Sequence, residues 1–223
     1  MKRTLLGVSM VLVLVVASSV VQAGSVLTVG DEIYFGNWSG GTFTAYPTGT
    51  SNFTTFDTFC AYLQGMLYVN GGTGYTYQVT GLGHVNQGGA SMTAQTAYLY
   101  TGFVNGTLPG YTGTVLQQQA IQYGIWSSLG ATDAQLQAEG GAILQGNLAA
   151  AEAEYNSMGW NVTPGSWSGF GNVEIATLTS LNGNNPAQDI LVMTVPVPEP
   201  TAMGLLGLGL GGLVVVRRKR LAK

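Results

Sequence analysis

Short runs of β-branched and aromatic residues alternate with polar residues along the first third of the chain, a pattern typical of β-strands. Glycine-rich turns separate the runs, and Pro47 is expected to end one of them. The pattern returns towards the end of the chain, so strands are expected both before and after a different middle segment. They cover 25–35, 42–46, 53–63, 66–69, 75–79, 172–179 and 189–195.

The middle of the chain, about residues 91–157, has apolar residues at helical spacing instead. Three helices are expected there, over 91–103, 115–129 and 132–156, the last with a break at 140–141. Each begins at or directly after a residue that can cap a helix, namely Ser91, Thr114 and Thr132, and Thr132 has capping-box spacing to Gln135. The second helix is expected to bury one apolar face, made of Leu116, Ala120, Tyr123, Trp126 and Leu129.

This order of elements favours an α+β fold. The expected architecture is a β-sandwich or barrel with an inserted three-helix segment, in which the first and last strands pair. The exported body, residues 24–196, has the size of a single domain of moderate length and can bury a core.

The start of the chain has the parts of a secretory signal peptide. Lys2 and Arg3 precede an apolar run, and the small residues of Val21-Gln22-Ala23 suit signal peptidase. We therefore expect residues 1–23 to be a signal peptide that is cleaved after Ala23.

The other end, residues 197–223, contains Pro198-Glu199-Pro200 and then an apolar run without charge at 202–216. A membrane-spanning helix needs about 20 apolar residues, so this run predicts one minimal C-terminal transmembrane helix. The positive-inside rule keeps the basic residues that follow in the cytoplasm and places the body outside. These basic residues are Arg217, Arg218, Lys219 and Arg220.

A Pro-Glu-Pro triplet, a short apolar helix and a basic end in this order resemble the PEP-CTERM sorting signal of Gram-negative, exopolysaccharide-producing bacteria. The resemblance implies processing at Pro198, Glu199 and Pro200 by the membrane enzyme exosortase. It also implies a transient stage in the inner membrane, followed by the cell surface or extracellular matrix. The alternative is an ordinary tail anchor behind a proline linker. Expected partners are therefore signal peptidase, exosortase and the inner membrane, with exopolysaccharide or surface amines as further candidates.

Charged residues are placed unevenly along the chain. All seven Lys and Arg lie in the first three residues or after Val216, whereas the ten acidic residues lie between Asp31 and Glu199. A body without Lys or Arg repels a phosphate backbone, which excludes nucleic acid as a partner. Its surface must be made polar mainly by uncharged side chains and by many of the 34 glycines.

The only cysteine of the chain, Cys60, cannot form an internal disulfide. Cysteine is often simply a small buried side chain, which is one interpretation here. The other starts from the second helix, where Gln122 lies one turn before Trp126 beside the apolar face. Gln118 lies one turn earlier on the same side and is the alternative glutamine.

Cys60 on an expected strand, with Gln122-Tyr123-Gly124-Ile125-Trp126 on a helix, resembles the thioester domains of bacterial surface adhesins. The resemblance implies that Cys60 and Gln122 condense with loss of ammonia into a thioester that acylates a nucleophile on a target. This sequence departs from the family motif at Ile121 and Gly124, where threonine and alanine are typical.

The remaining residues indicate no enzyme. His84 has no second His or Cys near it, so neither a metal nor a cofactor is expected, and no catalytic residue is assigned. A sugar-stacking surface is conceivable for Tyr34, Trp38, Tyr46, Trp160 and Trp167, although such residues more often form core. The leading hypothesis is a structural or interaction protein of the envelope or biofilm, delivered by the tail. The alternative hypothesis is a covalent adhesin.

Overall fold

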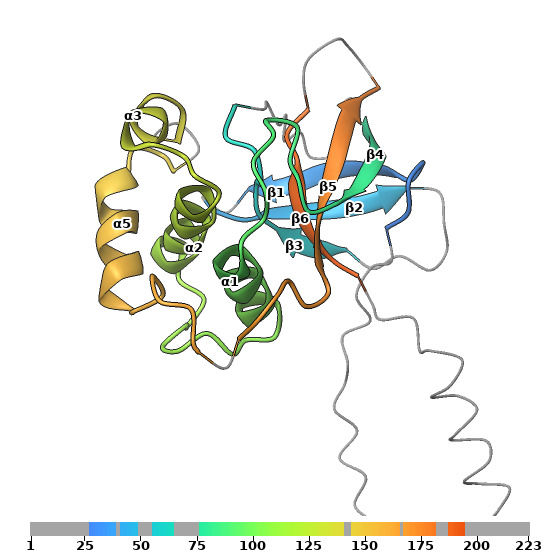
Figure 1. Ribbon diagram of the computed structural model, residues 1–223. Helices are drawn as coiled ribbons and strands as arrows, with labels where there is room; N and C mark the ends of the chain where they lie inside the picture. Colours follow the sequence, from blue (N-terminus) through green and yellow to red (C-terminus); the bar gives the residue numbers. More distant parts are fainter. Residues whose placement is uncertain are drawn as a thin grey trace, which may run out of the picture.

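The computed structural model describes residues 27–38, 41–48, 55–64, 76–140, 144–165, 167–181 and 187–194. They form an antiparallel sheet with a group of helices beside it (Figure 1). The expected signal peptide, the sorting tail with its transmembrane helix, the strand at 66–69 and the turn at 182–186 lie outside the described residues. Within these ranges, no helix has the length and apolar character needed to cross a membrane.

Six antiparallel strands form one sheet in the described part of the chain, in the order β3-β2-β1-β4-β5-β6. Strands β4 and β5 pair with each other and flank the helical segment, so the helices are inserted between two neighbouring strands. The mixed α+β class and the insertion are therefore confirmed. The strands are β1 (Glu32–Trp38), β2 (Phe43–Thr48), β3 (Phe56–Thr58), β4 (Thr76–Gly83), β5 (Val173–Ser180) and β6 (Ile190–Met193).

The two edges of the sheet meet just after β3. Cys60 forms an isolated antiparallel bridge with Ile190 of β6. The flanking residues make the hydrogen bonds, from Ala61 N–H to the Asp189 carbonyl at 2.7 Å and from Leu191 N–H to the Phe59 carbonyl at 3.0 Å. The single sheet is thus rolled towards a barrel rather than split into the two layers of a sandwich.

Pairing of the first and last strands was a wrong expectation. Strand β1 pairs with β2 and β4, and β6 pairs with β5. The chain segment that meets the free edge of β6 is the one around Cys60. Residue periodicity predicts which stretches are strands, but the partner of each edge depends on how far the sheet rolls.

Several strand boundaries also differ from the expected ones; β3, for example, covers only Phe56–Thr58 of the expected 53–63, so Cys60 lies outside it. Strand β1 begins at Glu32 because residues 28–31 form a turn: Gly30 has φ 103°, and Thr28 N–H donates to the Asp31 carboxylate at 2.6 Å. Pro47 lies inside β2, opposite Ile33. Strand β3 pairs only with 43–45, so among the described residues the far side of Pro47 has no strand that needs its missing N–H.

The helical insertion contains α1 (Ala94–Val104), α2 (Val115–Ser128), a short α3 (Asp133–Gln135), the π-helical turn η1 (Leu136–Gly140) and α5 (Leu148–Ser157). The caps at Thr114 and Thr132 and the break at Gly140 are confirmed. The cap at Ser91 is wrong. Ser91 forms a bridge with Val85 instead, and the side chain of Thr93 caps α1.

Helix α2 packs against both α1 and α5 and lies between α5 and the sheet (Figure 1). All residues from Gln119 to Trp126 are buried, including Gln119 and Gln122. The apolar face expected for α2 was narrower than the surface that the helix buries. Leu116, which was placed on that face, is 36% exposed. A helix covered on most sides needs no apolar stripe, because its polar side chains find partners in the interior.

Candidate functional site

Cys60 lies in the core of the molecule, at the point where the edges of the sheet meet. Its side chain has no exposed surface, and it belongs to the same buried cluster as Phe59 and Ala61. Burial raises the pKa of the Cys60 thiol well above its ordinary value, because the thiolate would lose its hydration. In this environment the neutral thiol is the favoured form.

The main chain of Cys60 needs a partner on the side away from β6. In its bridge with Ile190, the hydrogen bonds are made by the flanking residues, so the N–H and carbonyl of Cys60 point outwards. The side-chain amide of Gln122 meets them: Cys60 N–H donates to Oε1 at 2.8 Å, and Nε2 donates to the Cys60 carbonyl at 2.9 Å. The side-chain amide of Gln122 thus makes the two hydrogen bonds that a neighbouring strand would otherwise make to Cys60.

The two candidate glutamines have different surroundings. Gln122 is fully buried against Cys60, whereas Gln118 is half-buried, and its Oε1 accepts a hydrogen bond from the Thr42 hydroxyl at 3.3 Å. The structure therefore brings Gln122 to Cys60 and gives Gln118 a contact with the start of β2. Whether Cys60 and Gln122 form a bond stays a prediction.

Gly41 determines how closely α2 approaches the sheet. A Cβ atom at this position would lie 2.6 Å from the main-chain carbon of Gln118 and 2.6 Å from the nitrogen of Gln119. Because main-chain atoms cannot move aside as a flexible side chain can, only glycine fits here without a shift of the helix. This contact holds α2 in the position from which Gln122 reaches Cys60.

The aromatic side chains around Cys60 hold its segment against α1. The ring of Phe59 packs edge-on against Phe103, with 4.8 Å between centroids, and against Tyr100 at 6.4 Å. The Thr58 hydroxyl donates to the Leu191 carbonyl and ties the same segment to β6. Cys60 is therefore held from both sides in a rigid part of the core.

The arrangement has one feature that favours acyl chemistry and one that opposes it. The Cys60 N–H polarises the Gln122 carbonyl group and is placed to stabilise an oxyanion at Oε1. Burial opposes the reaction, because it disfavours the thiolate that would attack. The same two hydrogen bonds also serve a purely structural purpose, since they satisfy buried polar groups.

Gly124, where the adhesin motif has alanine, allows close packing of two helices. A Cβ atom there would lie 2.3 Å from Cε2 of Tyr155 on α5. The departure from the motif therefore has a local packing reason on the side of α2 that carries Tyr155. The motif in the sequence gave no sign of this contact, because Tyr155 is 31 residues away.

A buried carboxylate lies next to the Cys60 bridge and was not anticipated from the sequence. Asp189 has no exposed surface, and its two oxygens accept hydrogen bonds from Gln87, one from the main-chain N–H at 2.6 Å and one from Nε2 at 2.7 Å. Burial raises the pKa of Asp189, and the hydrogen bonds from Gln87 offset part of that rise. Without a basic residue in the body, amides are the partners available to it.

The expected aromatic sugar surface does not exist as one surface. Tyr34 and Tyr46 stack across β1 and β2 at 4.9 Å, whereas Trp160 is buried and donates from Nε1 to the Pro109 carbonyl. Trp167 packs edge-on against Tyr98. The side chain of Trp38 lies outside the described residues.

His84 is exposed and contacts the ring of Phe170, with 4.5 Å between centroids. Within the described ranges, no cluster of three or more His, Cys, Asp or Glu side chains could hold a metal ion. The expectations that the protein uses no metal or cofactor and is no enzyme stay predictions.

Comparison with known proteins identifies one segment of the chain. Residues 196–220 match the PEP-CTERM protein-sorting motif. No curated protein and no solved structure matches the chain. The match covers the triplet Pro198-Glu199-Pro200, the apolar run and Arg217 to Arg220, which confirms the sorting signal recognised in the sequence. The chain therefore carries a PEP-CTERM sorting motif, which marks it as an exported protein of a Gram-negative bacterium targeted to exosortase.

Proposed function

We propose that this protein is a non-enzymatic component of the cell envelope or biofilm matrix, released from its membrane stage by exosortase. The observation that carries the proposal is the sorting motif at residues 196–220. The charge distribution supports it, because the segment between the two basic ends contains no Lys or Arg and ten acidic residues. Such a body has no basic patch that would bind it to an anionic surface.

The folded body supports a structural or binding role. Its polar side chains are used mainly in hydrogen bonds that join distant elements, as with Gln87 and Asp189 or Gln122 and Cys60. Salt bridges to Lys or Arg cannot form in it, since those residues are absent between Arg3 and Arg217. Stability that depends little on such pairs changes little with ionic strength, which suits a protein outside the cell.

The tail proposal is tested by the substitution Glu199→Ala in the full chain. Glu199 is the charged residue of the triplet, so its loss should stop processing and leave the protein in the inner-membrane fraction. Glu174→Ala, at a half-buried position of β5, is the control for a general effect of removing a carboxylate. If Glu199→Ala reaches the surface or medium as the wild type does, the tail acts only as an anchor.

A second function, covalent capture of a surface amine, is favoured by the placement of Gln122 on Cys60. In this proposal Sγ of Cys60 attacks Cδ of Gln122, the Cδ–Nε2 bond breaks, and Nε2 leaves as ammonia with the thiol proton. An amine of the target then attacks Cδ, which forms an amide and restores the Cys60 thiol.

Intact mass distinguishes this second function from a buried thiol. Thioester formation lowers the mass of the exported protein by about 17 Da, the mass of ammonia. Methylamine should then add to the wild type but not to Cys60→Ala, which cannot form the bond. An exported protein of full mass that does not react with methylamine leaves the pair with its structural role alone.

A further inference from the structure

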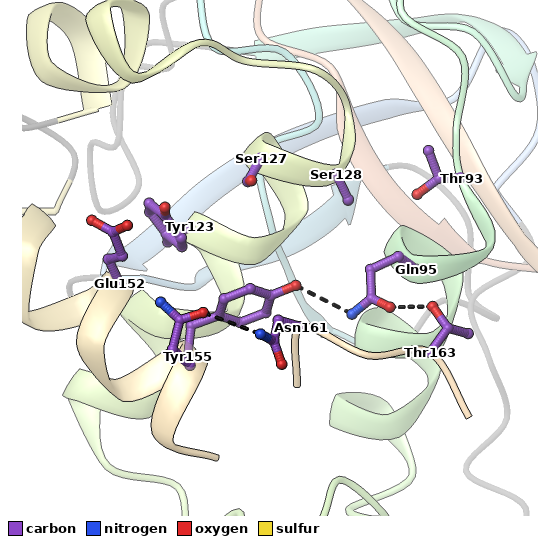
Figure 2. Close-up of a pocket in the computed structure, with 10 residues that line it drawn as sticks. Thr93, Gln95, Tyr123, Ser127, Ser128, Glu152, Tyr155, Asn161 and Thr163 are labelled. Carbon is purple, nitrogen blue, oxygen red and sulfur yellow. Dashed lines mark hydrogen bonds between the residues drawn. The ribbon is translucent and has the colours of Figure 1, made fainter. Parts of the chain in front are cut away.

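An open cleft of about 480 Å³ lies between the beginning of α1, the second half of α2 and α5 with the segment that follows it (Figure 2). Every described side chain that lines it carries a hydroxyl, carboxamide or carboxylate group. Its volume falls in the range of small-molecule sites, which is about 300–1,000 Å³, but such sites are mostly apolar. The ligand that fits this cleft must therefore be polar over most of its surface.

One end of the cleft is held in a fixed arrangement by Gln95. Its Nε2 donates to the Tyr155 hydroxyl at 3.2 Å and to the Trp160 carbonyl, and its Oε1 accepts from the Thr163 hydroxyl. Figure 2 shows Gln95, Tyr155 and Thr163 joined in this way. Groups that are already ordered lose little conformational entropy when a ligand binds.

The other end of the cleft carries Tyr123 and Glu152 (Figure 2). Burial, followed by hydrogen bonding to Glu152, raises the pKa of Tyr123 to about 12. Its hydroxyl therefore remains protonated at neutral pH. The rings of Tyr123 and Tyr155 meet edge-on at 5.7 Å. Both rings are buried, so the cleft meets a ligand mainly through hydrogen-bonding groups, which match the hydroxyls of a sugar.

The charge of the cleft restricts which polar ligands it can bind. Glu152 is its only charged side chain among the described lining residues. No Lys or Arg exists between Arg3 and Arg217 to attract an anion. Phosphorylated and uronic-acid ligands are therefore repelled from the cleft.

We propose that this cleft binds a neutral sugar unit of an oligosaccharide or polysaccharide. Its open shape lets a chain continue beyond the bound unit. The site is distinct from the pair Cys60–Gln122, because Gln122 and Tyr123 are consecutive residues of α2 and project about 100° apart. The proposal goes beyond the proposed sorting and capture functions and depends on neither.

Saturation-transfer NMR on the full chain tests this assignment. The protein is kept in a zwitterionic detergent without a sugar headgroup, and the probes are α- and β-linked neutral hexose disaccharides. Lysine methyl ester serves as a cationic probe. Three variants are compared with the wild type: Ser127→Phe, which fills the cleft from an exposed position of α2; Glu152→Gln, which removes the charge; and Glu154→Gln, a control outside the cleft.

The proposal predicts saturable transfer to at least one neutral disaccharide. Ser127→Phe should abolish it, whereas the control Glu154→Gln should keep it within about threefold of the wild type. Thermal melts of each variant check that the fold is intact. The proposal is wrong if no neutral disaccharide receives transfer, or if Ser127→Phe leaves it unchanged. Transfer to the lysine ester alone, lost in Glu152→Gln, would assign the cleft to amines instead.

Discussion

The side-chain amide of Gln122 pairs with both polar main-chain groups of Cys60, at 2.8 Å from the N–H and 2.9 Å from the carbonyl. This contact joins the central helix α2 to the point where the edges of the rolled sheet meet. It therefore stabilises the fold whether or not the two side chains ever react. The structural and the covalent roles make different predictions.

Gln122→Ala should destabilise the protein strongly. It leaves the buried N–H and carbonyl of Cys60 without partners, at a cost of about 1–3 kcal/mol for each group. Gln118→Ala is the matched control one helical turn away, and it should cost less because Gln118 is only half-buried. Urea unfolding of both variants measures the difference. Equal losses of unfolding free energy in the two variants would show that the hydrogen bonds to Cys60 add no stability beyond that of an ordinary half-buried glutamine.

Gln122→Glu should make stability depend on pH. The introduced carboxylate can accept from the Cys60 N–H but would also face the Cys60 carbonyl, so burial and repulsion raise its folded pKa above the unfolded value of about 4.3. The variant should therefore be most stable, relative to wild type, below about pH 4.3 and lose stability as pH rises through the raised pKa. Unfolding curves at several pH values measure this, and a constant difference contradicts it.

Gly41→Ala should be much more harmful than a glycine substitution in open space. Its new methyl group would lie 2.6 Å from main-chain atoms of α2, and overpacking of this kind costs about 1–3 kcal/mol. Gly83→Ala is the control, since no atom lies within 4 Å of a Cβ there. Thermal unfolding compares the two. If Gly41→Ala has the same melting temperature as the wild type, α2 does not pack closely against Gly41.

Asp189 should make the protein more stable in mild acid. Its raised folded pKa means that the folded state binds a proton more tightly than the unfolded state, whose pKa is about 3.9. The contribution of Asp189 is thus fully present below about pH 3.9 and is lost as pH rises through the folded pKa. The unfolding free energy of the wild type minus that of Asp189→Asn should therefore decrease from mild acid to neutral pH. A difference that grows over this range would contradict the assignment.

The sequence predicted the elements of the fold better than their arrangement. Capping side chains such as Thr114 and Thr132 act within one helical turn, so they could be recognised from local spacing. The cap of α1 was misplaced by two residues because Ser91 is taken up by a bridge to Val85. The closure of the sheet through Cys60 and Ile190 joins residues 130 positions apart, and no local pattern encodes it.

The candidate sites show the same limit. The spacing of Gln122 and Trp126 placed Gln122 beside the buried face of α2. The groups of Cys60 that Gln122 contacts are main-chain atoms, however, and these leave no signature in the sequence. Gly41 belongs to one of the glycine-rich turns expected between the strands, and the sequence does not indicate its close contact with α2. The polar cleft is assembled from α1, α2 and α5, and its residues look like ordinary surface side chains when taken in order.

The fate of the tail tests the central claim, that the protein is exported and processed at its sorting motif. Peptide mass spectrometry of the protein recovered from the surface or medium covers residues 24–223 in one measurement. We predict peptides from the body but none from the apolar run or from Arg217 to Lys223, because processing at Pro198-Glu199-Pro200 removes them. An exported protein that still ends in Lys223 contradicts the claim.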